Sequence, residues 1–174
     1  QSDPALTIEK DLERRDFTIN AMAVELGDGS VSHGTLIDPF GGLEDLQRRL
    51  LRSVGTPVER FQEDYSRMLR ALRFSCQLHC AIEPETWAGI LKLMPHITDL
   101  QDESVRADDS DHVVPAETIA KEFLKSFWFD PVRAFDLYDQ SGAFAALMPE
   151  LLTMKGCPHP KAYHSEGDVW AHTR

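Results

Sequence analysis

The sequence predicts a mainly α-helical protein with a small β portion. From Pro57 onward, every segment with periodic apolar residues has the spacing of a helix. Before that point, two short runs with β propensity flank Gly27, Asp28 and Gly29, which tolerate the positive φ of a hairpin turn. With 174 residues, the chain is long enough to bury a sizeable core as one medium domain or two small ones.

The N-terminal third contains the predicted strands. Residues 11–24 predict a short helix or turn that runs into a strand, and residues 23–32, AVELGDGSVS, predict a hairpin. Residues 34–55 predict a strand, a turn and a helix. Pro39 and Gly41 interrupt the strand, and the leucines after them, including Leu50 and Leu51, recur at helical spacing.

The rest of the chain is expected to be helical. Residues 60–76 predict a single helix with an apolar face at Phe61, Tyr65, Met68, Leu69 and Leu72. Further helices are expected in residues 83–94, 115–127 and 130–151, the last with a pause at Gly142. Four aromatic residues are expected in the core: Trp87, Phe123, Phe127 and Trp128.

Basic residues are concentrated in one part of an acidic chain. The formal net charge is -11, yet residues 48–73 hold 7 basic and 3 acidic side chains. Residues 1–47 hold 3 and 10, and residues 75–174 hold 8 and 16. A protein that coats nucleic acid would be basic overall, so that class is disfavoured. The pattern favours one focused site for an anionic ligand.

The cysteines and the hydropathy indicate the compartment. Cys76, Cys80 and Cys157 are an odd number without paired spacing, which favours a reducing, cytoplasmic setting with buried thiols at the first two. No apolar run approaches the roughly 20 residues of a membrane helix, and no signal peptide is apparent. The tail spacing matches no zinc pattern, so no metal site is expected from Cys157, His159, His164 and His172.

The segment RFQEDYSRMLRALRF, residues 60–74, combines an acidic pair with several arginines. On a helix, Arg67 would lie one turn from both Glu63 and Asp64. One interpretation is a solvated face with salt bridges, each worth about 0.3–0.5 kcal/mol.

The other interpretation is recognition of a base. Adenine and cytosine both present an amino donor beside a ring-nitrogen acceptor, whereas guanine and uracil present a carbonyl and an N–H. A carboxylate only accepts hydrogen bonds and a guanidinium only donates them. Asp64 and Arg67 together would therefore select A and C over G and U without a nucleic-acid template, and the further arginines would hold the triphosphate.

Three motifs occur in order along the chain: RRDFTINAMA (14–23), DPFGGLEDL (38–46) and EDYSRMLRALRF (63–74). The first resembles a motif that contacts the ribose and positions a nucleotide. The second resembles a strand–turn–helix joining a catalytic head to a neck, and the third resembles an EDxxR amino-acid template. Together they resemble the class II tRNA nucleotidyltransferases (CCA-adding enzymes) and bacterial poly(A) polymerases. Residues 115–151 are similar to the neck and body helices of that family.

The resemblance implies roles for individual residues. Asp64 and Arg67 would read the base, and Arg70 and Arg73 would support the nucleotide. The first motif would lie at the ribose and phosphates, where Asp16 could accept a hydrogen bond from the 2′-hydroxyl. The predicted nucleotide-binding residues are Arg15, Asp16, Asn20, Glu63, Asp64, Arg67, Arg70 and Arg73. Asn20 could equally be a satisfied amide at a helix start, and Arg14 could pair with Glu13 or face solvent.

The chain also departs from the family pattern. The family's catalytic DxD carboxylates, which hold two Mg²⁺ ions, are expected upstream of residue 14 and are absent here. This segment alone is therefore expected to bind ATP and CTP without transferring them, with Mg²⁺ required in the complete enzyme. Tyr65 stands where the family usually has proline. Residues 164–173 resemble the opening of an HD-type phosphohydrolase domain.

The resemblance implies five regions. These are the remainder of a nucleotidyltransferase head (1–55), a nucleotide-selecting helical neck (56–100), an acidic mobile linker (101–116), a helical body (117–156) and the start of a truncated HD-type domain (157–174). The fold is thus expected to be the C-terminal part of an α/β head followed by a helical neck and body.

The implied function is template-independent addition of CCA to the 3′ end of tRNA, using CTP and ATP. A poly(A) polymerase, or an enzyme that adds only A or only C, would share the base-reading pair. Two alternatives come from other classes: a non-catalytic nucleotide- or RNA-binding helical module, and an HD-type phosphohydrolase. The expected partners are an RNA 3′ end and nucleoside triphosphates, with no membrane and with homodimerisation through exposed apolar surface. Lys121 and Lys125 could contact the tRNA backbone or form a solvated face.

Overall fold

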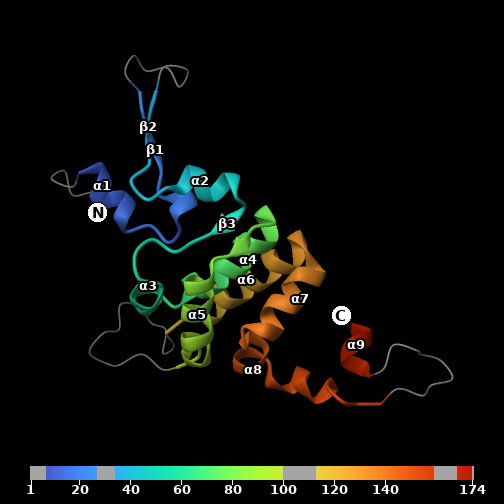
Figure 1. The fold of residues 1–174 in the computed structure, drawn as a ribbon. Coiled ribbons are helices and arrows are strands. Elements are labelled where there is room, and N and C mark those ends of the chain that lie inside the picture. The colour runs from blue at the N-terminus through green and yellow to red at the C-terminus, as the bar shows by residue number, and fades with distance from the viewer. Residues whose placement is uncertain (1–6, 27–33, 100–112, 159–167, 174) are drawn as a thin grey trace.

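A computed structural model describes residues 7–26, 34–99, 113–158 and 168–173. Helices make up most of it, with two small two-stranded sheets, so the prediction of a mainly α fold is confirmed (Figure 1). The predicted hairpin turn and most of the predicted acidic mobile linker lie outside the described residues. Among the described residues, no helix is both long and apolar enough to cross a membrane.

The N-terminal part begins with α1 (Ile8–Glu13) and the 3-10 helix η1 (Thr18–Asn20). Strands β1 (Ala23–Glu25) and β2 (Thr35–Ile37) then pair antiparallel, with Ala23 opposite Ile37. The first strand of the predicted hairpin is confirmed, but its partner is Thr35–Ile37, which was predicted as a separate strand, and residues 27–33 lie outside the described residues. Figure 1 shows the two strands projecting away from the helices.

Helix α2 (Gly42–Gln47) follows a turn that depends on two glycines and one aspartate. The carboxylate of Asp38 accepts hydrogen bonds from the N–H groups of Gly42 at 2.7 Å and Leu43 at 2.9 Å, so it caps the helix. Gly41 has a φ of 72°, in the left-handed region. A Cβ at Gly42 would lie 2.1 Å from the carbonyl oxygen of Thr18, so no side chain fits there. The DPFGG sequence therefore packs α2 directly on η1.

Helix α2 is shorter than the leucine spacing predicts. It ends at Gln47, and Arg49 has a φ of 52°. Leu50 and Leu51, predicted to be helical, form strand β3 instead, which pairs in parallel with β4 (Ala81–Ile82). Leu51 is buried in the core, so pairing with a distant strand overrides local helix propensity here.

The prediction of one helix over residues 60–76 is wrong. Helix α3 (Pro57–Glu63) ends before Asp64, which is extended with φ −157° and ψ 101°, and α4 (Ser66–Leu78) begins two residues later. Asp64 Oδ1 accepts a hydrogen bond from the N–H of Ser66 at 2.9 Å. Asp favours such local bonds over helix continuation, whereas the apolar spacing passes through the break unchanged.

The remaining elements are helical, as predicted, and pack around the main hydrophobic core. They are α5 (Pro84–Leu93), η3 (Met94–His96), α6 (Ala116–Phe129), α7 (Pro131–Gln140), α8 (Ala143–Leu147), η4 (Pro149–Met154) and α9 (Val169–Thr173). Helices α4 and α6 pack against each other in the middle of the molecule. Gly142 has a φ of 79° at the predicted pause between α7 and α8.

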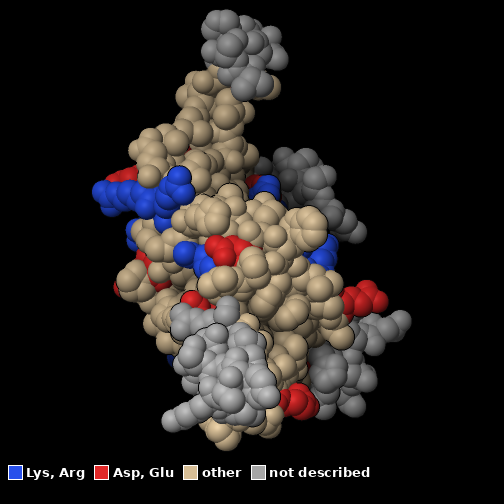
Figure 2. All heavy atoms as spheres, turned by 90° about the vertical axis from the view of Figure 1, so that its right-hand side faces the viewer, with Lys and Arg blue, Asp and Glu red and all other residues tan. Residues whose placement is uncertain are grey.

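The main core gathers apolar side chains from α3 to α8, including Phe61, Met68 and Leu72. Trp87, Phe123 and Phe127 pack against it, as predicted. Trp128 is 85% exposed, so its predicted core position is wrong. It lies one residue beyond the buried stripe of α6, where no neighbouring helix covers it. On the face shown in Figure 2, residues without charge make up most of the surface.

Candidate nucleotide-binding site

A cavity of about 610 Å³ lies between the segment after α1, the start of α4 and the first turns of α6. Six of the eight residues predicted to bind nucleotide line it: Arg15, Asp16, Asn20, Asp64, Arg67 and Arg70. The other lining residues are Arg14, Ser66, Thr118, Lys121 and Glu122. Two motifs separated by about fifty residues in the sequence thus meet at one cavity, whereas Glu63 and Arg73 do not line it.

Asp16 connects the first motif to α4. Its side chain is buried, and Arg70 Nε and Nη2 lie 2.8 and 2.7 Å from its Oδ2. Its Oδ1 accepts hydrogen bonds from the N–H of Phe17 at 3.0 Å and from Asn20 Nδ2 at 3.1 Å. Asp16 therefore positions Arg70 and Asn20, and much of its accepting capacity is used within the protein. Its contact with a 2′-hydroxyl stays a prediction.

Asp64 and Arg67 both keep hydrogen-bonding groups available. Asp64 is exposed, and its Oδ2 has no partner within the described part of the chain. Within the described residues, the guanidinium of Arg67 donates only through Nη1, to Glu63 and to the carbonyl oxygen of Arg60 at 2.9 Å. An acceptor and a donor thus stand together at the cavity, which is the combination that the amino edge of adenine or cytosine requires.

Glu63 orients the guanidinium of Arg67. Its Oε2 accepts hydrogen bonds from Arg67 Nη1 at 2.7 Å and from Arg60 Nη1 at 2.8 Å. The hydrogen bond from Arg67 lowers the pKa of Glu63 below its usual range, with a further contribution from the charge of Arg60. Glu63 therefore acts on the cavity through Arg67.

Arg73 points into the protein rather than into the cavity. It is 7% exposed, and its Nε donates to Glu122 of α6, which is 5% exposed. Its Nη1 donates to Gln77 at 2.7 Å, and its guanidinium lies 3.9 Å from the centre of the Phe74 ring. The structure thus gives Arg73 a role in joining α4 to α6, and its predicted support of the nucleotide stays a prediction.

The cavity is basic within an acidic protein. Its lining has five basic and three acidic side chains, a formal net charge of +2, whereas the whole chain has -11. Arg14 and Arg15 are both paired with Asp11, at 2.8 and 3.2 Å, and both remain more than half exposed. Their hydrogen bonds lower the pKa of Asp11. Exposed pairs of this kind are weak, so a phosphate can compete for these arginines.

The residues present do not fit a magnesium site. Within the described residues, no three His, Cys, Asp or Glu side chains gather as metal ligands would. At the cavity, Asp16 and Glu122 are each engaged by an arginine. We therefore derive no step through a metal ion.

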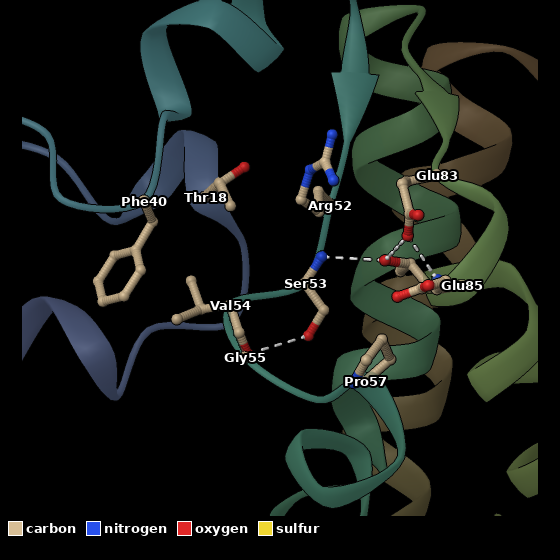
Figure 3. A pocket seen from close by; sticks show the side chains of 10 residues that line it. Thr18, Phe40, Arg52, Ser53, Val54, Gly55, Pro57, Glu83 and Glu85 are labelled. Atoms are coloured by element: carbon tan, nitrogen blue, oxygen red, sulfur yellow. Dashed lines mark hydrogen bonds between the residues drawn. The ribbon is translucent and has the colours of Figure 1, made fainter.

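A second cavity, of about 220 Å³, lies where the segment after β3 meets α5 (Figure 3). Its polar groups bind one another: Glu83 Oε2 accepts from the N–H and Oγ1 of Thr86, at 2.7 and 2.9 Å, and Thr86 Oγ1 accepts from the N–H of Ser53 at 3.0 Å. Burial opposes ionisation of Glu83, but these hydrogen bonds prevail and lower its pKa. Arg52 is paired with Asp45 at 3.1 Å. This cavity is a junction between elements rather than an open binding site.

Sequence reasoning did not assign Thr118 and Glu122 to the site. A signal for Glu122 was available, because it shares a helical face with Ile119, Phe123 and Ser126. A carboxylate on the apolar face of a helix indicates a buried ion pair. The proximity of α6 to the first motif depends on tertiary packing, so no comparable signal for Thr118 is present in the sequence.

The comparisons with known proteins agree with this geometry. A family described as the poly A polymerase head domain matches residues 1–52. The multifunctional CCA proteins of Nitrosococcus oceani and Alkalilimnicola ehrlichii are each 40% identical to the chain, over 98% of its length. The chain is thus similar to multifunctional CCA proteins over nearly its whole length, and its first 52 residues match a nucleotidyltransferase head domain. The chain spans 37% of the length of these two relatives.

Solved structures of the nucleotidyltransferase family show the same fold. The CCA-adding enzyme of Bacillus stearothermophilus in complex with CTP matches with a TM-score of 0.62 and 35% identity, over 78% of this chain and 30% of that one. The CCA-adding enzyme of Thermotoga maritima complexed with tRNA matches with a TM-score of 0.68 and 29% identity, over 83% and 32%. The fold is therefore that of the later part of a nucleotidyltransferase head followed by helical neck and body regions.

Proposed function

We propose that the protein is a template-independent RNA nucleotidyltransferase that adds CMP and AMP, from CTP and ATP, to the 3′ end of tRNA. The whole protein's activity is a proposal because the chain spans only 37% of its curated relatives. Support comes from relatives named as CCA proteins and from related structures with CTP, ATP and tRNA.

The observation that carries the proposal is the placement of Asp64 and Arg67. Each has a free hydrogen-bonding edge at one basic cavity, and each is held by a neighbour, Asp64 by the N–H of Ser66 and Arg67 by Glu63. Such preorganisation allows hydrogen bonds to discriminate between bases, because an unmatched base leaves groups unpaired. The proposed selection is for ATP and CTP over GTP and UTP.

The test is equilibrium binding of the four ribonucleoside triphosphates to the wild-type chain, Asp64→Ala and Arg67→Ala. We expect ATP and CTP to bind at least about tenfold more tightly than GTP and UTP, and either substitution to remove that preference. Arg48→Ala is the matched control, since Arg48 is an exposed arginine paired with Glu44 and does not line the cavity. Equal binding of all four nucleotides by the wild type would contradict base reading.

Related activities share this base-reading pair. Addition of A alone, addition of C alone and poly(A) synthesis all use nucleotides with the same amino edge, and incorporation assays on tRNA ending in -C, -CC or -CCA would separate them. A non-catalytic nucleotide- or RNA-binding module is the second candidate, favoured by the basic cavity, which can hold an anionic ligand whether or not transfer follows. Nucleotide binding without incorporation by the whole protein would support it.

The proposal includes further expectations about setting and partners. A cytoplasmic location is supported by three free thiols, two of them buried, and burial raises the pKa of Cys76 to about 11. Magnesium dependence of the whole protein is supported by the family relationship alone. Homodimerisation is supported by the exposed apolar side chains of α6.

A further inference from the structure

Lys121 differs from the other cations at the cavity. Arg14, Arg15, Arg67 and Arg70 are each within 4.0 Å of a carboxylate oxygen, whereas Lys121 forms no ion pair within the described part of the chain. It is exposed, and it lines the cavity from α6. Its positive charge is therefore available to a ligand.

The acidic residues nearby do not cancel that charge. Glu122, the next residue, is buried and bound to Arg73, and Asp16 is bound to Arg70. Asp64 Oδ1 accepts a hydrogen bond from the N–H of Ser66. Asp16 and Glu122 are thus each paired with an arginine, Asp64 keeps Oδ2 for a ligand, and none of the three is paired with Lys121 within the described residues.

Thr118 adds a hydroxyl at the same place. It precedes Lys121 by three residues on α6, so the two side chains lie on one helix face, and both line the cavity. Thr118 is half-buried, and its hydroxyl makes no hydrogen bond within the described residues. An ammonium with three donors and a hydroxyl donor together suit a phosphate oxygen.

We propose that Thr118 and Lys121 form a phosphate-binding subsite on α6, opposite the arginines of the first motif. The phosphate would belong either to the backbone of the RNA 3′ end or to the triphosphate of the nucleotide. This inference rests on the proposed function for the identity of the ligands, but it concerns α6, whereas base reading concerns the α3–α4 junction. The subsite makes the body helix a direct part of the substrate site.

The test compares Lys121→Gln with Lys125→Gln in the complete chain. Lys125 lies one turn further along α6, is also exposed and unpaired within the described residues, and does not line the cavity. The probes are a single-stranded oligoribonucleotide with a free 3′-hydroxyl, and ATP, each titrated at several KCl concentrations. We expect Lys121→Gln to weaken binding of at least one probe by about 3–10-fold and Lys125→Gln to change neither.

The two probes distinguish the two phosphate sources. A backbone phosphate predicts weaker RNA binding by Lys121→Gln and a salt slope reduced by about 0.7, the value for one phosphate contact on a single strand. A triphosphate contact predicts weaker ATP binding with unchanged RNA binding. Thr118→Val, which keeps the shape and removes the hydroxyl, should weaken the same probe as Lys121→Gln.

Other outcomes would overturn the inference or leave only the proposed function in doubt. Equal binding by Lys121→Gln and the wild type, equal losses in both lysine variants, or no binding of either probe by the wild type would each overturn the subsite. If Lys121→Gln weakens a probe while the wild type binds all four nucleotides equally, the subsite stands and base reading fails. If base preference is intact in every variant and Lys121→Gln has no effect, base reading stands and the subsite fails.

Discussion

Glu63 bridges two arginines through a single carboxylate oxygen, and this arrangement favours the ionised form of its own carboxyl group. Its hydrogen bond with Arg67 connects the end of α3 to the start of α4 across the extended Asp64. Its bond with Arg60 adds a second cation that is 13% exposed. Because the pKa of Glu63 is lowered in the folded protein, the carboxylate stays ionised wherever nucleotide binding would be measured.

Glu63→Gln should therefore destabilise the protein in a pH-dependent way. A carboxylate with a lowered pKa in the folded state contributes stability above its unfolded pKa of about 4.3, and the contribution disappears as the pH falls through the folded value. Glu63 is 52% exposed, so the expected loss at pH 7 is about 0.5 kcal/mol. Urea unfolding of wild type and variant from pH 7 to pH 3 would measure it. Glu59→Gln on the same helix is the control, and a loss independent of pH would contradict the ion-pair account.

Individual site residues could be predicted from the sequence where the hydrogen-bonding chemistry of their side chains matched a ligand. Asp64 and Arg67 were predicted from what their side chains can donate and accept, and the structure brings both to the cavity. Arg73 follows Arg70 by three residues on α4, just as Arg70 follows Arg67, yet Arg73 pairs with Glu122 instead of lining the cavity. Which of two arginines on one helix faces a ligand depends on a partner 49 residues away, and local spacing carries no information about that.

At the scale of elements, the Arg73–Glu122 pair joins α4, which carries Arg67 and Arg70, to α6. Both side chains are buried, so removal of one partner leaves an uncompensated charge in the core. The Phe74 ring lies between Arg73 and Arg70, 3.9 and 5.5 Å from the two guanidinium carbons. The ion pair, the ring and the Asp16–Arg70 pair form one continuous series of contacts from the first motif to the body helix.

Glu122→Ala should destabilise the protein by about 3–5 kcal/mol, since it leaves the buried charge of Arg73 without a partner. The double variant Glu122→Leu with Arg73→Met should recover most of that loss, because an apolar pair of similar volume needs no charge compensation. Urea unfolding of Glu122→Ala would measure the first effect, and a mutant cycle of Glu122→Leu, Arg73→Met and their double variant would measure the second. Additive losses would show that the two residues do not interact as the structure indicates.

The order and type of most elements followed from the sequence, whereas two boundaries did not. The hairpin, α5, α6 and the α7–α8 pause have strong local signals in turn residues, proline and apolar spacing. The break at Asp64 and the end of α2 at Gln47 depend on a side-chain cap and on the pairing of β3 with β4. At both boundaries the helical spacing of apolar residues continues, but other contacts end the helix. Periodicity alone therefore predicts a longer helix at each. The five predicted regions and their boundaries stay predictions.

At the scale of the whole molecule, apolar side chains remain uncovered on α6 and at the start of α7. The most exposed are Trp128 at 85% and Leu124 at 66%, one turn apart, with Val132 nearby in sequence. Single exposed apolar residues are common, but a run of this kind on consecutive turns is a contact surface or a cause of association.

We expect the chain to associate with itself as its concentration rises, through this surface. Trp128→Gln should reduce the association, because it removes the most exposed aromatic side chain without disturbing the core. Sedimentation velocity over a concentration series would measure it. Val24→Gln, which changes an exposed apolar residue on β1, is the control. A wild-type chain that stays monomeric throughout the series would contradict the prediction.

The walls of the candidate nucleotide cavity come from three stretches of chain, near residues 14–20, 64–70 and 118–122. A chain in which any one of them has detached has no cavity, so a ligand binds the folded state and leaves the unfolded ensemble unaffected. Thermodynamic linkage then makes the ligand itself a stabiliser, contributing about 2.7 kcal/mol when its concentration is a hundred times its Kd. For the nucleotide proposed as the ligand, its supply and the resistance of the chain to thermal unfolding would therefore be two aspects of the same equilibrium.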